Sequence, residues 1–288
     1  MRVLCGTSPS SVPSDSDPGR LWETSKFWAG HAATASVARM TVTPGAASTL
    51  LRPVLTGSDT RGRVIAVLGR CVYAAVSGEL VAVEAARGHR LPCSVLLADG
   101  IERGAFASVR PGDPTTAGGG RLRLGALQVA VRRWWRPAAP CDAVPVLPRR
   151  DLTGTPRDPG WDRLALSLLG LGPGLTPAGD DLLCGLLVGL AGRPDLRDPL
   201  AAAVLSHAAR RTTFLSAELL RHAAAGLAAP AVVAVADALA GHGDDAALAR
   251  CLPRLLALGH TSGRALAQGL LLAAGTVARH PIGSLEAA

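Results

Sequence analysis

The sequence contains little of several residue types that mark particular classes of protein. Only 3% of its 288 residues are aromatic, and Lys26 is the only lysine among its 30 lysine and arginine residues. Its six cysteines are dispersed and show no CxxC or CxxH spacing, which argues against a zinc site and against a disulfide framework. With 48% hydrophobic residues and so few aromatics, the composition favours tightly packed helices over an aromatic-rich β-sandwich.

Long hydrophobic runs are also absent. The longest apolar stretches, near residues 182–191 and 265–278, are shorter than the roughly 20 residues that cross a bilayer. The first 20 residues are rich in Ser, Pro and Asp and lack the apolar core of a signal peptide. We therefore expect a cytoplasmic protein without a membrane partner, in which residues 1–36 form a disordered or loosely ordered tail.

The formal net charge of +8 raises the question of a nucleic-acid partner. The arginines occur singly or in pairs, however, with no aromatic interleaving beyond Trp134 and Trp135. Nucleic acid is therefore not favoured, and a small anionic substrate explains the charge equally well. The preference for arginine over lysine, with abundant Ala, Gly and Pro, is typical of a GC-rich bacterial genome.

The pattern of the chain changes near its middle. Residues 37–136 contain short alternating or β-branched runs separated by turn sequences such as SGE and AGGG, which predicts a small β-barrel or sandwich domain. Residues 137–160 are rich in proline and lack periodicity, as in a linker. Residues 161–288 show a 3.6-residue period, which predicts an all-α helical bundle. The expected fold class is α+β, with the ligand site in the helical domain.

The most informative segment is GLGPGLTPAGDD, residues 170–181, called here the glycine-rich block. Gly172 and Gly174 leave the backbone unobstructed, Thr176 suits a helix N-cap, and Pro177 suits the first helical turn. A glycine loop that leads into a helix N-terminus is suited to binding an anion. The two adjacent aspartates would repel that anion unless a metal, an arginine or a proton intervenes.

The glycine-rich block is not a nucleotide-binding loop, because no GK[ST] sequence follows its glycines. Nucleotide binding is therefore disfavoured. A Mg²⁺ ion that bridges Asp180 or Asp181 to a phosphate stays open, and no other cofactor is indicated.

The block has an internal echo near the C-terminus. Residues 179–187 (GDDLLCGLL) align with residues 263–271 (GRALAQGLL). Gly185 and Gly269 take equivalent positions and would let two helices cross closely. We predict that the starts of these two helices converge on one ligand, with chance recurrence in a leucine-rich chain as the alternative.

Three segments together resemble the AllH family, described as a subunit of oxamate carbamoyltransferase. They are GLGPGLTPAGDDLLCGLL, RRTTFLSAELLRHAAAG and LGHTSGRALAQGLL. The resemblance implies a β domain followed by a helical domain, and a transferase that moves a carbamoyl group between carbamoyl phosphate and oxamate or a related acceptor. It also implies partner subunits. The third segment carries Ala265 where the family usually has an aspartate, which puts a metal-binding or substrate-orienting role of that position in doubt.

Carbamoyl transfer requires a cradle for phosphate, a polarised carbonyl and a deprotonated acceptor nitrogen. Adjacent aspartates point about 100° apart on a helix, so we expect one to cap the helix and Asp181 to act as base, acceptor-orienting group or metal ligand. Stabilisation of the helix dipole by the pair is the alternative. The candidate catalytic residues are Asp180, Asp181 and His260. The candidate substrate-binding residues are Gly172, Gly174, Thr176, Gly179, Arg211, Thr212, Thr213, Ser216, Thr261, Ser262 and Gly263.

A second interpretation stays open beside the transferase. The chain is then a non-catalytic subunit that binds a small anion through its helical domain and docks a partner enzyme through its β domain.

Overall fold

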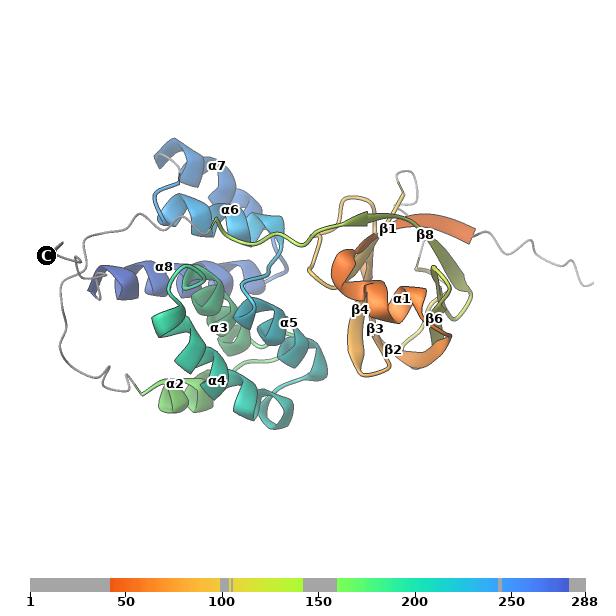
Figure 1. Ribbon diagram of the computed structural model, residues 1–288, viewed down its shortest axis with the longest axis horizontal. Helices are drawn as coiled ribbons and strands as arrows, with labels where there is room; N and C mark the ends of the chain where they lie inside the picture. The colour runs from red at the N-terminus through yellow and green to blue at the C-terminus, as the bar shows by residue number, and fades with distance from the viewer. Residues whose placement is uncertain (1–41, 99–103, 105, 142–159, 243–244, 280–288) are drawn as a thin grey trace, which may run out of the picture. The chain divides into compact units, whose positions relative to one another are not determined.

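The structure is a computed structural model that describes residues 42–98, 104, 106–141, 160–242 and 245–279. The expected tail, most of the expected linker and the last residues of the chain lie outside these ranges. Strands occur before residue 136 and long helices after residue 160, as expected for an α+β fold (Figure 1). The division into separate domains stays a prediction.

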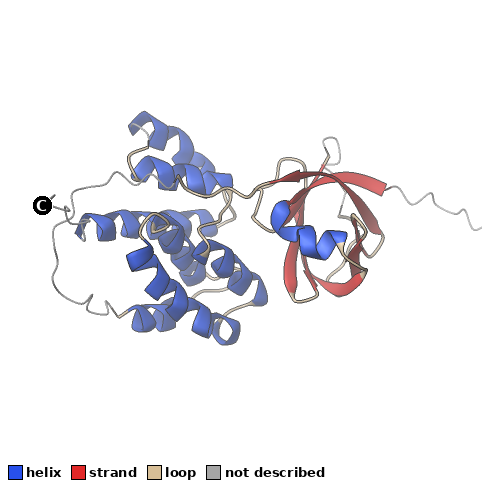
Figure 2. Cartoon of the chain, in the orientation of Figure 1, coloured by secondary structure: helices blue, strands red, loops and turns tan. Residues whose placement is uncertain are grey.

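The N-terminal half forms a closed eight-stranded barrel in the order β1-β5-β4-β3-β2-β6-β7-β8 (Figure 2). Neighbours are antiparallel except for the parallel pairs β1–β8 and β4–β5. Closure leaves the barrel without a free sheet edge. The strands are β1 (Val42–Ser48), β2 (Thr60–Leu68), β3 (Cys71–Val76), β4 (Glu79–Glu84), β5 (Ser94–Leu97), β6 (Pro114–Gly118), β7 (Arg121–Leu124) and β8 (Leu127–Trp135).

Alternation and turn chemistry explain the barrel. In β7 the two leucines are buried and the two arginines are exposed, as a strand with one face toward a core requires. Ser77 and Gly78 both have positive φ in the two-residue connection between β3 and β4, which matches the twist of a tight hairpin. The short helices Thr49–Leu51 and α1 (Arg52–Thr56) follow β1. Of the two predicted alternatives, the structure has the barrel.

The second half of the described chain is helical. Its helices are α2 (Trp161–Leu168), α3 (Ala178–Gly189), α4 (Pro194–Arg211), α5 (Phe214–Ala224), α6 (Pro230–Leu239), α7 (Asp245–Leu256) and α8 (Ser262–Arg279). Their periodic apolar residues form a buried cluster rich in Leu, Ala and Val. Among the described helices, none combines the length and the apolar character that a membrane crossing needs. The closer description as a bundle stays a prediction.

Helices α3 and α8 pack with their backbones in close approach, and glycines make this packing possible. A Cβ atom added at Gly185 would lie 2.2 Å from the carbonyl oxygen of Leu266, and one added at Gly269 would lie 2.1 Å from that of Leu182. Both distances are far below any real contact. The two aligned glycines therefore face the partner helix, and the close crossing predicted from the internal echo is confirmed.

Candidate functional site

The glycine-rich block forms an irregular turn that delivers the chain into α3. Gly172 and Gly174 have φ values of +114° and +97°, which side chains disfavour, so these two positions need glycine. The helix begins at Ala178, with Pro177 rather than Thr176 at the N-cap position. The predicted cap was therefore wrong by one residue, because Pro177 has an extended ψ of 142° and lies before the first helical residue.

The starts of α3 and α8 lie side by side. The hydroxyl oxygens of Thr176 and Ser262 are 3.2 Å apart, although 86 positions separate them in the chain. The predicted convergence of the two helix starts is thus confirmed. The ligand on which they would converge stays a prediction.

Gly179 and Gly263 serve packing at this junction. The N–H of Gly179 donates to the Leu171 carbonyl and that of Gly263 to the Leu258 carbonyl, both at 2.9 Å. A Cβ atom at either glycine would lie 2.1 Å from a carbonyl oxygen of the preceding helix. Their N–H groups are therefore engaged within the protein, which differs from the anion-donor role expected of Gly179.

Asp180 is buried, with 1% of its surface exposed, and both of its carboxylate oxygens accept hydrogen bonds. The N–H of Gly170 donates to Oδ1 at 2.8 Å. The hydroxyl of Thr212 donates to Oδ2. Asp180 therefore fastens the beginning of the block to the turn between α4 and α5.

Asp181 is also buried, at 5% exposure, but its situation is different. Its Oδ2 atom has no hydrogen-bond partner among the described residues. Burial raises the pKa of Asp181 to about 6, the negative charge of Asp180 acts in the same direction, and the hydroxyls of Ser262 and Thr176 oppose the shift. Asp181 is therefore a buried carboxylate with a free acceptor atom and a pKa close to neutrality, as proton-transfer groups often have.

The α4–α5 turn supports the block from another direction. The hydroxyl of Thr213 accepts the N–H of Ser216 at 3.0 Å, which caps α5, and donates to the Leu175 carbonyl at 2.6 Å. Ser216 is buried behind this cap. Arg211 is exposed, and its guanidinium donates to the Leu166 carbonyl at 3.2 Å. The hydroxyls of Thr212 and Thr213 therefore both form hydrogen bonds within the protein, which differs from the substrate-binding role expected of them.

In the GHTSG turn, residues 259–263, the first three residues are exposed, Ser262 is half-buried and Gly263 is buried. His260 and Thr261 are exposed, and the Thr261 carbonyl accepts the N–H of Ala265 at 3.1 Å. The His260 side chain forms no hydrogen bond with the described residues. The structure therefore brings Asp181, Thr176 and Ser262 together, while His260 stands on the exposed side of the turn.

Gly170 was missed by the sequence interpretation. Its φ is +74°, and a Cβ atom there would lie 2.2 Å from the Arg211 carbonyl oxygen. The available signal was the glycine itself, directly after an apolar helix.

A family model described as oxamate carbamoyltransferase subunit AllH matches residues 168–274. The resemblance to the AllH family is confirmed. The match contains all three sequence segments that carried the resemblance, together with the starts of α3 and α8, and it does not include the barrel strands. Neither the curated proteins nor the solved structures give a match to this chain.

The AllH region offers few ligands for a metal. No group of three or more His, Cys, Asp or Glu residues suited to a metal ion occurs in the part of the chain that the structure describes. Both oxygens of Asp180 are engaged, and Ala265 supplies no carboxylate. Asp181 would then be the one carboxylate that could hold a Mg²⁺ ion together with a phosphate. A single protein carboxylate can suffice, because Mg²⁺ keeps several of its waters as ligands.

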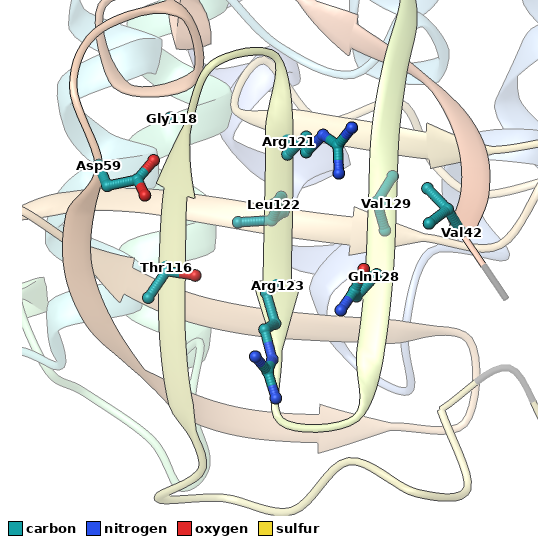
Figure 3. Close-up of a pocket in the computed structure, with 9 residues that line it drawn as sticks. All are labelled: Val42, Asp59, Thr116, Gly118, Arg121, Leu122, Arg123, Gln128 and Val129. Atoms are coloured by element: carbon teal, nitrogen blue, oxygen red, sulfur yellow. The ribbon is translucent and has the colours of Figure 1, made fainter. Parts of the chain in front are cut away.

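The barrel contains a separate shallow hollow of about 200 Å³, outside the AllH match (Figure 3). The residues that line it include Arg121 and Arg123 of β7, Gln128 of the neighbouring strand β8, and Asp59. The guanidinium of Arg123 donates to the Gly125 carbonyl at 3.1 Å. None of the site residues expected from the sequence lies in this hollow.

Proposed function

We propose that this chain is a subunit of a carbamoyltransferase, and that it binds the carbamoyl acceptor between the starts of α3 and α8. The proposed reaction moves a carbamoyl group between carbamoyl phosphate and oxamate. The observation that carries the proposal is the unpartnered Oδ2 atom of Asp181, buried where the two helix starts meet. An N–H group of an acceptor would supply the missing hydrogen bond.

Asp181 would act as the general base. The acceptor nitrogen forms a bond to the carbamoyl carbon, the bond from that carbon to the phosphate oxygen breaks, and phosphate leaves with the electron pair. The nitrogen loses a proton, which passes to the carboxylate of Asp181. With a pKa of about 6 this carboxylate is mostly ionised at pH 7, yet basic enough to accept a proton in the transition state.

The surroundings of Asp181 support an anionic substrate with a polar end. Two helix N-termini lie side by side there and present the positive ends of their dipoles. The hydroxyls of Thr176 and Ser262 are 3.2 Å apart and can each bind an oxygen of the substrate. In this proposal Arg211 and His260, both exposed, act only on groups that reach the surface of the site.

The AllH model is described as a subunit, so we extend the proposal to partner subunits. If Asp181 held a Mg²⁺ ion, the ion would take the place of its role as general base and would supply positive charge to stabilise the leaving phosphate.

The test is an assay with carbamoyl phosphate and oxamate, with and without the subunits that co-purify with the tagged chain from its native cells. Asp181→Asn should lower turnover by about 10²- to 10⁴-fold, as expected for a general base. Asp162→Asn is the matched control, because Asp162 also lies in a first helical turn but is exposed. Turnover of Asp181→Asn at the wild-type rate would remove the assigned role.

A binding measurement separates catalysis from simple binding. Thermal stabilisation by oxamate without turnover in any combination of subunits would favour the non-catalytic anion-binding subunit. If oxamate causes no thermal stabilisation and no combination of subunits shows turnover, both interpretations are contradicted.

A further inference from the structure

The glycine-rich block is tied to the α4–α5 turn by two hydrogen bonds, and a third bond within the block links Gly170 to Asp180. Asp180 receives the Gly170 N–H on one oxygen and the Thr212 hydroxyl on the other. Thr213 donates to the Leu175 carbonyl at 2.6 Å. Thr212 and Thr213, more than 30 residues along the chain, thus bind Asp180 and Leu175, and Asp180 in turn holds Gly170 at the start of the segment 170–176.

The ties matter because the segment between them has little rigidity of its own. Gly172 and Gly174 carry no side chain, are exposed, and have positive φ values, so a chain of this composition has many conformations of similar energy. Thr176 directly follows Leu175, whose carbonyl Thr213 holds. Its hydroxyl must lie beside Ser262 for the site around Asp181 to be complete.

We propose that Asp180 is a positioning residue, and that with Thr212 and Thr213 it clamps the glycine-rich block so that Thr176 faces Ser262 beside Asp181. The inference rests on the proposed function for its consequence in catalysis, and it assigns Asp180 no contact with substrate. Each oxygen of Asp180 already accepts a hydrogen bond and only 1% of the residue's surface is exposed, so its carboxylate is closed to a ligand.

Asp180 also places a negative charge next to Asp181, and this electrostatic effect can be separated from the clamp. In Asp180→Asn the amide oxygen can still accept the Gly170 N–H, and the amide nitrogen can donate to the Thr212 hydroxyl, so the clamp stays while the charge is lost. In Thr212→Val the charge stays while the hydroxyl bond is lost. Asp180 is the charged group that acts on Asp181. On the next turn of α3, burial raises the pKa of the Cys184 thiol, and the charges of Asp181 and Asp180 act in the same direction.

The clamp is tested first by amide hydrogen exchange of the full chain, which needs no substrate. Thr212→Val should raise the exchange rates of the Gly170 and Gly179 amides, which donate to Asp180 and to the Leu171 carbonyl, at least tenfold, whereas Asp180→Asn should leave them near the wild-type values. Thr212→Ser restores the hydroxyl and should restore slow exchange. Thr56→Val is the matched control, because it removes a threonine hydroxyl bond in α1, outside the helices that hold the site. Wild-type exchange in Thr212→Val would overturn the clamp.

The pH dependence of the Asp181 carboxyl carbon signal in NMR spectra provides the second readout. Asp180→Asn should lower the midpoint of this titration, because the neighbouring negative charge is gone, and Thr212→Val should leave it near pH 6. An unchanged midpoint in Asp180→Asn would contradict the electrostatic part.

Activity then connects the clamp to the reaction. Thr212→Val should lower kcat/KM about tenfold, because the Thr176 hydroxyl is no longer held in position. The acidic limb of the pH profile should not move, because Asp181 is still the general base. Wild-type kcat/KM in this variant, with fast exchange, would show that the clamp does not serve the site. If the wild-type protein lacks the proposed activity but shows the exchange pattern, the proposed function fails and the clamp stands.

Discussion

The start of α3 and the start of α8 are built alike and differ in one respect. In both, a glycine in the first turn lies against a carbonyl oxygen of the preceding helix, and a second glycine six residues later lies against a carbonyl of the other helix. The pairs are Gly179 with Gly185 and Gly263 with Gly269. The repeated glycines are therefore the residues that allow the helices to approach.

The difference lies in the residues that are not repeated. Asp180 and Asp181 follow the first glycine of α3, whereas Arg264 and Ala265 follow that of α8. Asp181 and Ala265 are both buried, and each lies four residues before the glycine that faces the other helix. The repeated glycines allow α3 and α8 to cross closely, and Asp181, which is not repeated, places a carboxylate at this crossing.

The sharpest consequence of this difference is that Asp181 costs stability. Its pKa is about 6 in the folded protein and 3.8 in the unfolded reference, so between these values the folded state holds a proton that the unfolded state has lost. Stability therefore falls as pH rises from about 4 to 6, by up to about 3 kcal/mol at pH 7. Asp181→Asn should be more stable than the wild type by up to that amount above pH 6, and equally stable near pH 3, as measured by urea unfolding.

Comparing the unfolding free energies of the wild type and Asp181→Asn at each pH separates the contribution of Asp181 from those of other titrating groups. His222 is buried, and burial lowers its pKa to about 4, so its contribution to stability is lost as pH falls from 6.5 toward 4. This loss runs opposite to the effect of Asp181 and is common to both proteins. A variant Asp181→Asn that is less stable than the wild type at pH 8 would identify the carboxylate as a structural group.

The repeated glycines should be equally sensitive on the two helices. Gly185→Ala and Gly269→Ala each bring a Cβ atom against a backbone carbonyl, which cannot move without displacing a helix. Each should lose about 3 kcal/mol and lower Tm by roughly 5–10 °C in calorimetry. Gly69→Ala is the control, because nothing lies within 4 Å of a Cβ atom there. A large effect at only one of the two glycines would break the equivalence of the helices.

Much of this arrangement was predictable from the sequence, and the reasons are local. The spacing of Gly185 and Gly269 within aligned segments predicted the close crossing, and alternation with turn residues predicted strands such as β7. Strands β1 and β6 were not individually predicted, because VTPGAAS and PTTAG are short and contain proline and glycine, which strands disfavour.

The separation of roles between the two aspartates was less accessible to sequence reasoning. It depends on Thr212 and Gly170 meeting Asp180, and on Ser262 lying beside Thr176, which are contacts between distant parts of the chain. Helical geometry gave the 100° divergence of adjacent side chains but not the partner that each would meet.

Restoring symmetry between the helix starts should shift the titration of Asp181. Ala265→Asp places a second carboxylate in the corresponding buried position of α8. Because two nearby carboxylates disfavour simultaneous ionisation, the midpoint of the Asp181 titration should rise above pH 6 by about one unit, as followed by NMR of its carboxyl carbon. Ala265→Asn controls for size. An unchanged midpoint in Ala265→Asp, or an equal rise in Ala265→Asn, would show that a charge at position 265 does not interact electrostatically with Asp181.

The two hydroxyls at the junction should differ slightly in their effect, which gives the finest comparison of the helix starts. Ser262 of α8 and Thr176 of the glycine-rich block both stabilise the ionised form of Asp181, and Ser262 has the larger influence. Ser262→Ala should therefore raise the pKa of Asp181 by about one unit or less, and Thr176→Val by a smaller amount. The same NMR titration measures both. The reverse order would mean that the carboxylate takes its main hydrogen bond from its own side of the crossing, so that the start of α8 contributes packing alone to the site.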